Sequence, residues 1–163
     1  MISIGVAGTW VTVTPYIGVA GVWKQVTGYW IGVGGQWKSL AQPPVTATVS
    51  PTSLSASISN SLPNTRVNVT TASATVTPAG GSGTYSYAWS VAFVSANSID
   101  STGTCSANSA TSATTTFTGQ TCNGTNSPGS DYYMASCVVT DTVSGATATV
   151  QVSIQLTNTY VGK

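Results

Sequence analysis

Histidine and glutamate are missing from this sequence, and charged residues of any kind are scarce. They make up 4% of its 163 residues, against about 25% in an ordinary soluble domain. General acid–base catalysis relies mostly on His, Glu and Asp, a Ser-His-Asp triad requires His, and a nucleophilic Cys needs a neighbouring base. The three carboxylates, Asp100, Asp131 and Asp141, are far apart in the sequence. We therefore expect neither an enzyme nor a bound cofactor.

The same scarcity limits the partners of the chain. Its basic residues are Lys24, Lys38, Arg66 and Lys163, and its net charge is +1. Nucleic-acid binding requires clustered Lys and Arg, so no nucleic-acid partner is expected. A low net charge also removes a protection against self-association. This favours a protein that works in a permanent assembly, as a homo-oligomer.

Long apolar stretches are absent as well. No run of about 18 apolar residues occurs, so no insertion into a membrane is expected. The start of the chain lacks the positively charged region of a signal peptide, since its first lysine is Lys24. The sequence thus predicts a chain that is not exported by the general secretory route, or a mature form without its leader.

Cysteine occurs three times, at Cys105, Cys122 and Cys137, without a Cys-x-x-Cys pair. Zinc sites need closely spaced Cys and His and Ca²⁺ sites need several carboxylates, so no metal is expected. Two interpretations of the thiols remain open. Either Cys105 and Cys122, which flank a predicted strand, form a disulfide in oxidising surroundings, or all three stay reduced and Cys137 is a buried small apolar residue.

The residues that are abundant favour β-structure. Val, Ile, Thr, Tyr and Trp are spread along the chain, and Gly, Pro, Asn and Ser interrupt it every several residues, a pattern typical of all-β proteins. The composition changes at residues 41–44 (AQPP), where consecutive prolines favour a stiff connector. We therefore predict two parts, residues 1–42 and residues 43–163.

The first part contains a threefold repeat. Its copies are residues 4–10 (IGVAGTW), 17–23 (IGVAGVW) and 31–37 (IGVGGQW), which begin 13 and 14 residues apart. This length fits one β-hairpin with a tight turn. Isolated hairpins are marginally stable in water, so we expect this segment to complete its core against a neighbouring surface.

The repeat also predicts the register of each hairpin. Turns centred on residues 7–8, 20–21 and 34–35 place each tryptophan opposite a glycine, where an indole can shield bare backbone. The predicted pairs are Trp10 with Gly5, Trp23 with Gly18, and Trp37 with Gly32. Tyr16, Tyr29 and Trp30 lie on the links between hairpins. These aromatic residues either fill a core or contact a partner protein or carbohydrate.

The second part alternates apolar and polar residues. Strands are expected near residues 45–49, 54–58, 67–69, 72–76, 85–91, 111–118, 133–139 and 148–156. Short strands with this period and frequent turn residues are typical of an immunoglobulin-like (Ig-like) β-sandwich.

Two segments of this part, residues 83–90 (GTYSYAWS) and 135–141 (ASCVVTD), resemble Ig-like and PKD-like modules of bacterial surface proteins and phage virion proteins. The resemblance covers about residues 45–156. It implies that Trp89 on strand C and Cys137 on strand F are stacked in the core, with Tyr87 and Val139 on the same faces of these strands. The sequence departs from antibody-type domains, because strand B has no cysteine and Ala135 stands where a tyrosine is usual.

Residues 21–38 (GVWKQVTGYWIGVGGQWK) resemble the tandem Trp-Gly repeats of tailed-phage structural proteins. The two resemblances together imply a virion protein that docks on a tail, neck or capsid protein through residues 1–42. Its Ig-like domain would be exposed on the particle surface, in weak contact with host glycans. The alternative is a bacterial cell-surface or secreted Ig-like module for adhesion or carbohydrate binding, which requires an export route.

Overall fold

The structure is a computed structural model that describes residues 2–6, 9–13, 16–25, 30–33, 35–39, 43–98, 101, 103–125 and 127–162. It divides into two units, residues 1–43 and 44–163. The division lies one residue from the predicted boundary. No helix suited to crossing a membrane occurs in the described part of the chain.

The first unit consists of β-hairpins, as the repeat predicts. Its strands are β1 (Ile2–Val6), β2 (Thr9–Val13), β3 (Tyr16–Val19), β4 (Val22–Gln25), β5 (Trp30–Val33) and β6 (Gln36–Ser39). Consecutive strands pair antiparallel, β1 with β2, β3 with β4, and β5 with β6. The predicted register is confirmed, since Trp10 lies opposite Gly5, Trp23 opposite Gly18, and Trp37 opposite Gly32.

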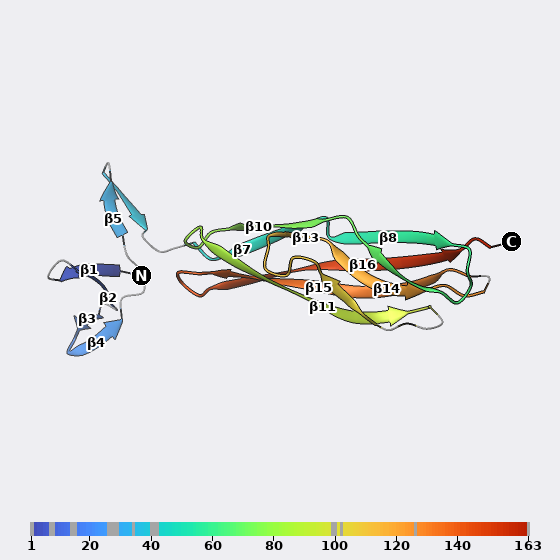
Figure 1. The fold of residues 1–163 in the computed structure, drawn as a ribbon. Helices are drawn as coiled ribbons and strands as arrows, with labels where there is room; N and C mark the ends of the chain where they lie inside the picture. The colour runs from blue at the N-terminus through green and yellow to red at the C-terminus, as the bar shows by residue number, and fades with distance from the viewer. Residues whose placement is uncertain are drawn as a thin grey trace. The chain divides into compact units, whose positions relative to one another are not determined.

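The second unit is a β-sandwich, so the predicted Ig-like fold is confirmed (Figure 1). Its first layer is a four-stranded sheet in the order β11-β15-β16-β8. The strands are β8 (Ser53–Asn60), β11 (Tyr85–Ala96), β15 (Gly129–Asp141) and β16 (Thr147–Tyr160). The strands β11, β15 and β16 pair antiparallel, whereas β8 runs parallel to β16.

The second layer contains two three-stranded sheets, in the orders β13-β10-β7 and β12-β14-β9. The strands are β7 (Thr46–Ser50), β9 (Arg66–Thr70), β10 (Ala74–Ala79), β12 (Cys105–Ala107), β13 (Thr114–Thr115) and β14 (Phe117–Cys122). Thr71 and Phe117 extend the pairing of β9 with β14 at the point where these strands meet the other sheet. The Thr71 N–H donates to the Phe117 carbonyl (2.9 Å), and the Phe117 N–H donates to Thr71 Oγ1 (3.1 Å), so a hydroxyl replaces a backbone acceptor where the strands are interrupted.

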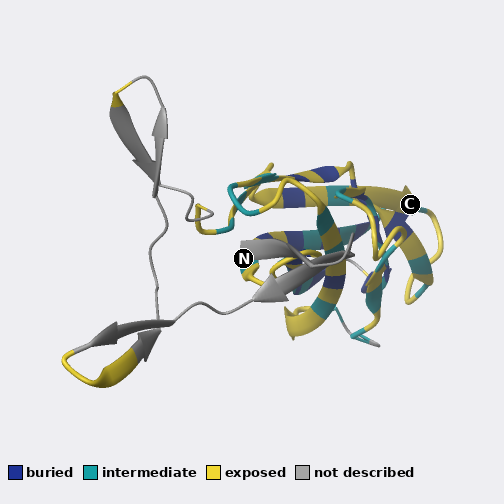
Figure 2. Ribbon diagram, turned by 90° about the vertical axis from the view of Figure 1, so that its left-hand side faces the viewer, coloured by how far each residue is buried: buried dark blue, intermediate teal, exposed yellow. Residues whose placement is uncertain are grey.

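Alternate residues of the strands form the core between the layers, and Figure 2 shows the resulting alternation of buried and exposed positions. The rings of Trp89 and Phe117 meet edge to face with centroids 5.4 Å apart, a favourable arrangement for aromatic pairs. The Trp89 indole N–H donates to the Ser112 carbonyl (2.9 Å). Cys137 lies opposite Trp89 on the neighbouring strand. Trp89, Phe117 and Cys137 are buried.

One predicted strand is displaced. Residues 108–113 form turns and bends instead of the start of a strand over 111–118, and the strand region begins at Thr114 and extends to Cys122. The alternation of Thr and Ala before Thr114 resembles that of an edge strand, but Ser109, Ala110 and Ser112 give their backbone groups to turns and to Trp89.

Candidate functional site

The tip of the second hairpin carries an exposed apolar pair. Ala20 and Gly21 both have positive φ, 50° and 81°, as a two-residue type I′ turn requires. Immediately after the turn, the Val22 side chain is 60% exposed and the Trp23 side chain is 75% exposed. An exposed large apolar group is a feature of interaction sites. Trp23 is therefore the best described candidate for a docking residue.

The other aromatic residues predicted to dock are placed only by their backbone. The prediction that Tyr16 and Trp30 lie on links between hairpins is wrong, because they begin strands β3 and β5, opposite Gln25 and Ser39. Trp10 and Trp37 occupy the same register position as Trp23, opposite a glycine. Among these tryptophans, the structure describes the exposed fraction of Trp23 alone. Tyr29 lies outside the described residues.

The residues predicted for the sandwich core have a structural role. Tyr87 lies opposite Val139, two positions from the pair of Trp89 and Cys137 along the same two strands. Val139 is fully buried and Tyr87 is partly buried against the core. Their packing in the core accounts for these side chains without a ligand.

The structure shows thiols and no disulfide between Cys105 and Cys122, the second of the two alternatives. Both residues belong to strands, Cys105 to β12 and Cys122 to β14. Cys105 lies opposite Gly119, three positions before Cys122. An odd offset places two residues on opposite faces of a sheet, which prevents a bridge. Burial raises the pKa of Cys105 to about 11 and also raises the pKa of Cys137, so both are poor nucleophiles.

The two described carboxylates, Asp131 and Asp141, lie ten positions apart on β15 and face the core at its two ends. At about 3.3 Å per residue they are roughly 33 Å apart, which excludes paired carboxylate chemistry. Ser98 Oγ donates to Asp131 Oδ1 (2.9 Å). Among the described residues, no group of three or more His, Cys, Asp or Glu side chains could hold a metal ion.

Asp141 joins two turns at one end of the sandwich. Its carboxylate accepts hydrogen bonds from Ser82 Oγ (2.7 Å), from the Val143 N–H (2.9 Å) and from the Ser144 N–H (3.2 Å), and from the Ser82 N–H. The bond from the Ser82 hydroxyl, followed by the backbone bonds, holds the pKa of Asp141 well below its usual range, against the opposing effect of burial. The arrangement is a structural clamp between residues 80–82 and 141–145.

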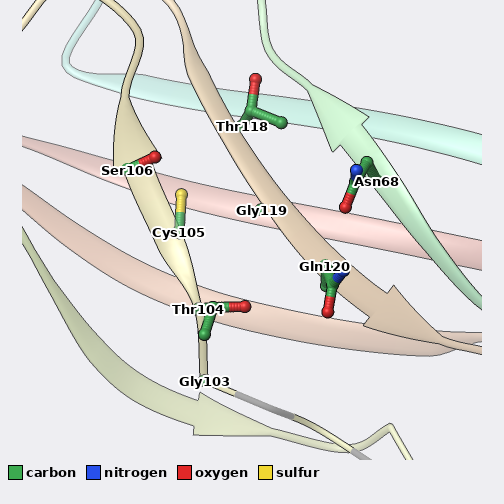
Figure 3. Close-up of a pocket in the computed structure, with 8 residues that line it drawn as sticks. All are labelled: Asn68, Gly103, Thr104, Cys105, Ser106, Thr118, Gly119 and Gln120. Atoms are coloured by element: carbon green, nitrogen blue, oxygen red, sulfur yellow. The ribbon is translucent and has the colours of Figure 1, made fainter.

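A groove of about 620 Å³, lined by uncharged residues, lies along β9, β14 and β12 (Figure 3). Its side chains include Asn68, Gln120, Thr118 and Ser106, which alternate with the core-facing residues of their strands. Gly119 permits the close approach of segment 103–105, because a Cβ there would lie 2.8 Å from the Thr104 carbonyl oxygen. The residues that line the groove are all uncharged and non-aromatic. The sequence indicates this groove only through the alternation of polar residues at 118 and 120.

No protein-family model matches the chain, and no curated protein matches it. A similar solved structure is the ASH/PapD-like domain of human CEP192 (PapD-like domain 7), with 10% sequence identity and a TM-score of 0.40 over 82% of this chain and 98% of that domain. Such a distant likeness carries no functional argument. The structure itself defines the class of the protein, an Ig-like β-sandwich preceded by β-hairpin repeats.

Proposed function

We propose that this protein is a structural component of a tailed-phage virion, in its tail, its neck or on its capsid surface. Residues 1–42 dock on other virion proteins, and the Ig-like domain is displayed at the surface of the particle. The observation that carries the proposal is the 75% exposure of Trp23 at the tip of a repeated hairpin, because large exposed apolar side chains are buried in stable assemblies.

The architecture of the first unit supports docking. Each of its sheets has two strands, so every strand keeps one edge open for pairing with another chain. Two-stranded hairpins are marginally stable alone, and a partner surface would stabilise them. The Ig-like unit, in contrast, has its own buried core and would fold independently of the particle.

The proposal is tested on particles of a phage that carries this gene. Full-length chain with Trp23→Ser should be lost from purified virions or much reduced, while unmodified chain is retained. Leu62→Ser is the matched control, since Leu62 is also an exposed apolar residue (65%) but belongs to the Ig-like unit. Equal retention of all three chains, or absence of the unmodified chain from virions, would contradict the proposal.

The groove favours a second candidate function, that of a carbohydrate-binding module for adhesion. Amide and hydroxyl side chains such as Asn68, Gln120 and Thr118 can hydrogen-bond the hydroxyls of a neutral sugar, and their lack of charge selects against ionic ligands. Without a lining aromatic ring, affinity would be weak, with Kd of about 1 mM. NMR titration with maltotriose and chitotriose tests this function. The sugars should shift resonances of the unmodified chain and of the control Gln151→Ala, whose substitution lies on the opposite layer, but not those of Gln120→Ala. Absence of shifts in the unmodified chain contradicts it.

A further inference from the structure

The sandwich has one long edge that nothing in the described residues covers. The two sheets of the second layer have short edge strands: β7 and β9 span five residues each, β12 spans three and β13 spans two. The first layer ends at β11 and β8. The β11 edge is partly covered, because the Trp89 N–H donates to the Ala110 carbonyl (2.8 Å). The eight-residue β8, in contrast, pairs only with β16 on its other side.

The hydrogen bonds to β16 show which groups of β8 point outward. The Ser153 N–H donates to the Thr52 carbonyl and the Val161 N–H to the Asn60 carbonyl. Since alternate residues of a strand turn both backbone groups to the same side, even-numbered residues of β8 face β16. The odd-numbered residues therefore direct their N–H and C=O groups to the open edge. These are Ser53, Ser55, Ser57 and Ser59.

The edge also lacks the features that prevent strand pairing. Natural edges are protected by charged residues, proline or bulges, and β8 reads SLSASISN without any of them. Its side chains are small, so another backbone can approach closely. Ile58 remains 39% exposed whereas Leu54 is buried at 8%, so the apolar row of β8 is incomplete at the edge.

We propose that β8 pairs antiparallel with β8 of a second copy of this chain, and so joins two four-stranded sheets into one. A second copy is the favoured occupant because Leu54 and Ile58 lie at equal distances on either side of Ala56, so an identical antiparallel strand places them opposite each other. The proposal does not depend on a role in phage particles.

One register satisfies all the outward groups. A two-fold axis at Ala56 places Ser53 opposite Ser59 and Ser55 opposite Ser57, and each such hydrogen-bonded pair exchanges two bonds. The intervening pairs then set Ile58 of one copy against Leu54 of the other, which covers the exposed Ile58. A shift of the axis by one residue along β8 leaves one serine of each copy without a partner.

Sedimentation velocity of the full-length chain tests the proposal. The concentration should reach about 1 mM, which is comparable to the effective concentration of two copies held close together in one assembly. Unmodified chain should dimerise. Ser57→Pro removes an outward N–H that the domain itself does not use, so it should weaken the dimer at least tenfold while leaving the melting temperature nearly unchanged.

A charge pair tests the register. The variant S55K/S57K places like charges opposite each other in the dimer and should be monomeric, whereas S55K/S57E places opposite charges there and should restore dimerisation. T149K/Q151K, with the same charges on the same face of β16 away from the edge, should dimerise normally. A monomer at all concentrations overturns the proposal. So does a dimer that survives both Ser57→Pro and S55K/S57K, and loss of that dimer in Trp23→Ser would then assign it to the hairpins.

Discussion

Replacement of Gly119 by alanine should destabilise the Ig-like domain through a contact that no composition or pattern reveals. A Cβ at this position would lie 2.7 Å from Leu156 Cδ1, 2.8 Å from the Thr104 carbonyl oxygen and 3.0 Å from Cys105 Cβ. Leu156 can change rotamer, but the Thr104 oxygen belongs to the backbone and moves only with the segment that leads into β12. Overpacking of this kind costs about 1–3 kcal/mol.

For a domain of this size the loss corresponds to a fall in melting temperature of about 4–12 °C. Thermal unfolding followed by circular dichroism measures it, with Gln120→Ala as the control, because the adjacent side chain faces the outer groove and its removal should change stability by about 0.5 kcal/mol or less. The double variant Gly119→Ala/Leu156→Ala should be less destabilised than the sum of the single variants, since the shortened side chain makes room. If Gly119→Ala has the same melting temperature as the Gln120→Ala control, the close packing of β12 against β14 is refuted.

Three further predictions follow from buried polar groups. Because the pKa of Asp141 is lowered in the folded state, its contribution to stability is present above the unfolded pKa of about 3.9 and is lost as pH falls toward the folded value. Asp141→Asn should therefore lower the melting temperature at about pH 7, and the difference should narrow progressively as pH falls below about 4, whereas parallel curves would count against the clamp. Asn158 accepts from Asn60 Nδ2 (3.0 Å) and donates to the Thr65 carbonyl (2.8 Å), so Asn158→Ala should cost about 1–3 kcal/mol in urea unfolding, against a near-neutral Gln155→Ala. Intact mass after alkylation in denaturant without reductant should show three modified thiols, whereas one modified thiol would show a disulfide. The native chain should be modified little at pH 8, because burial raises the pKa of Cys105 to about 11.

The repeats and the alternation predict the elements of this protein well. Trp10, Trp23 and Trp37 each lie opposite the predicted glycine, because turn position and strand period together determine a register. The pairing of Trp89 with Cys137 follows in the same way from two strands whose core faces are apolar.

The sequence does not indicate which residues pair with residues far away in the chain. Nothing local indicates that Cys105 lies opposite Gly119. The sequence therefore leaves both interpretations of the thiols possible, and the register of β12 and β14 argues against the disulfide. The groove depends on the same pairing, since it brings Asn68 of β9 beside Gln120 of β14. The displaced strand near Thr114 reflects backbone bonds of residues 109–112 to turns and to Trp89, which outweigh a weak β-pattern.

The parallel pairing of β8 with β16 also determines how the Ig-like domain responds to tension. The first strand of the domain and its C-terminus lie at opposite ends (Figure 1). Force applied between them pulls β8 from its N-terminal end and β16 from its C-terminal end, and slides the two strands past each other. All bonds of the eight-pair ladder are then loaded together instead of opening one after another. Single-molecule stretching should show a high rupture force that falls when Ala56→Pro removes one bond of this ladder.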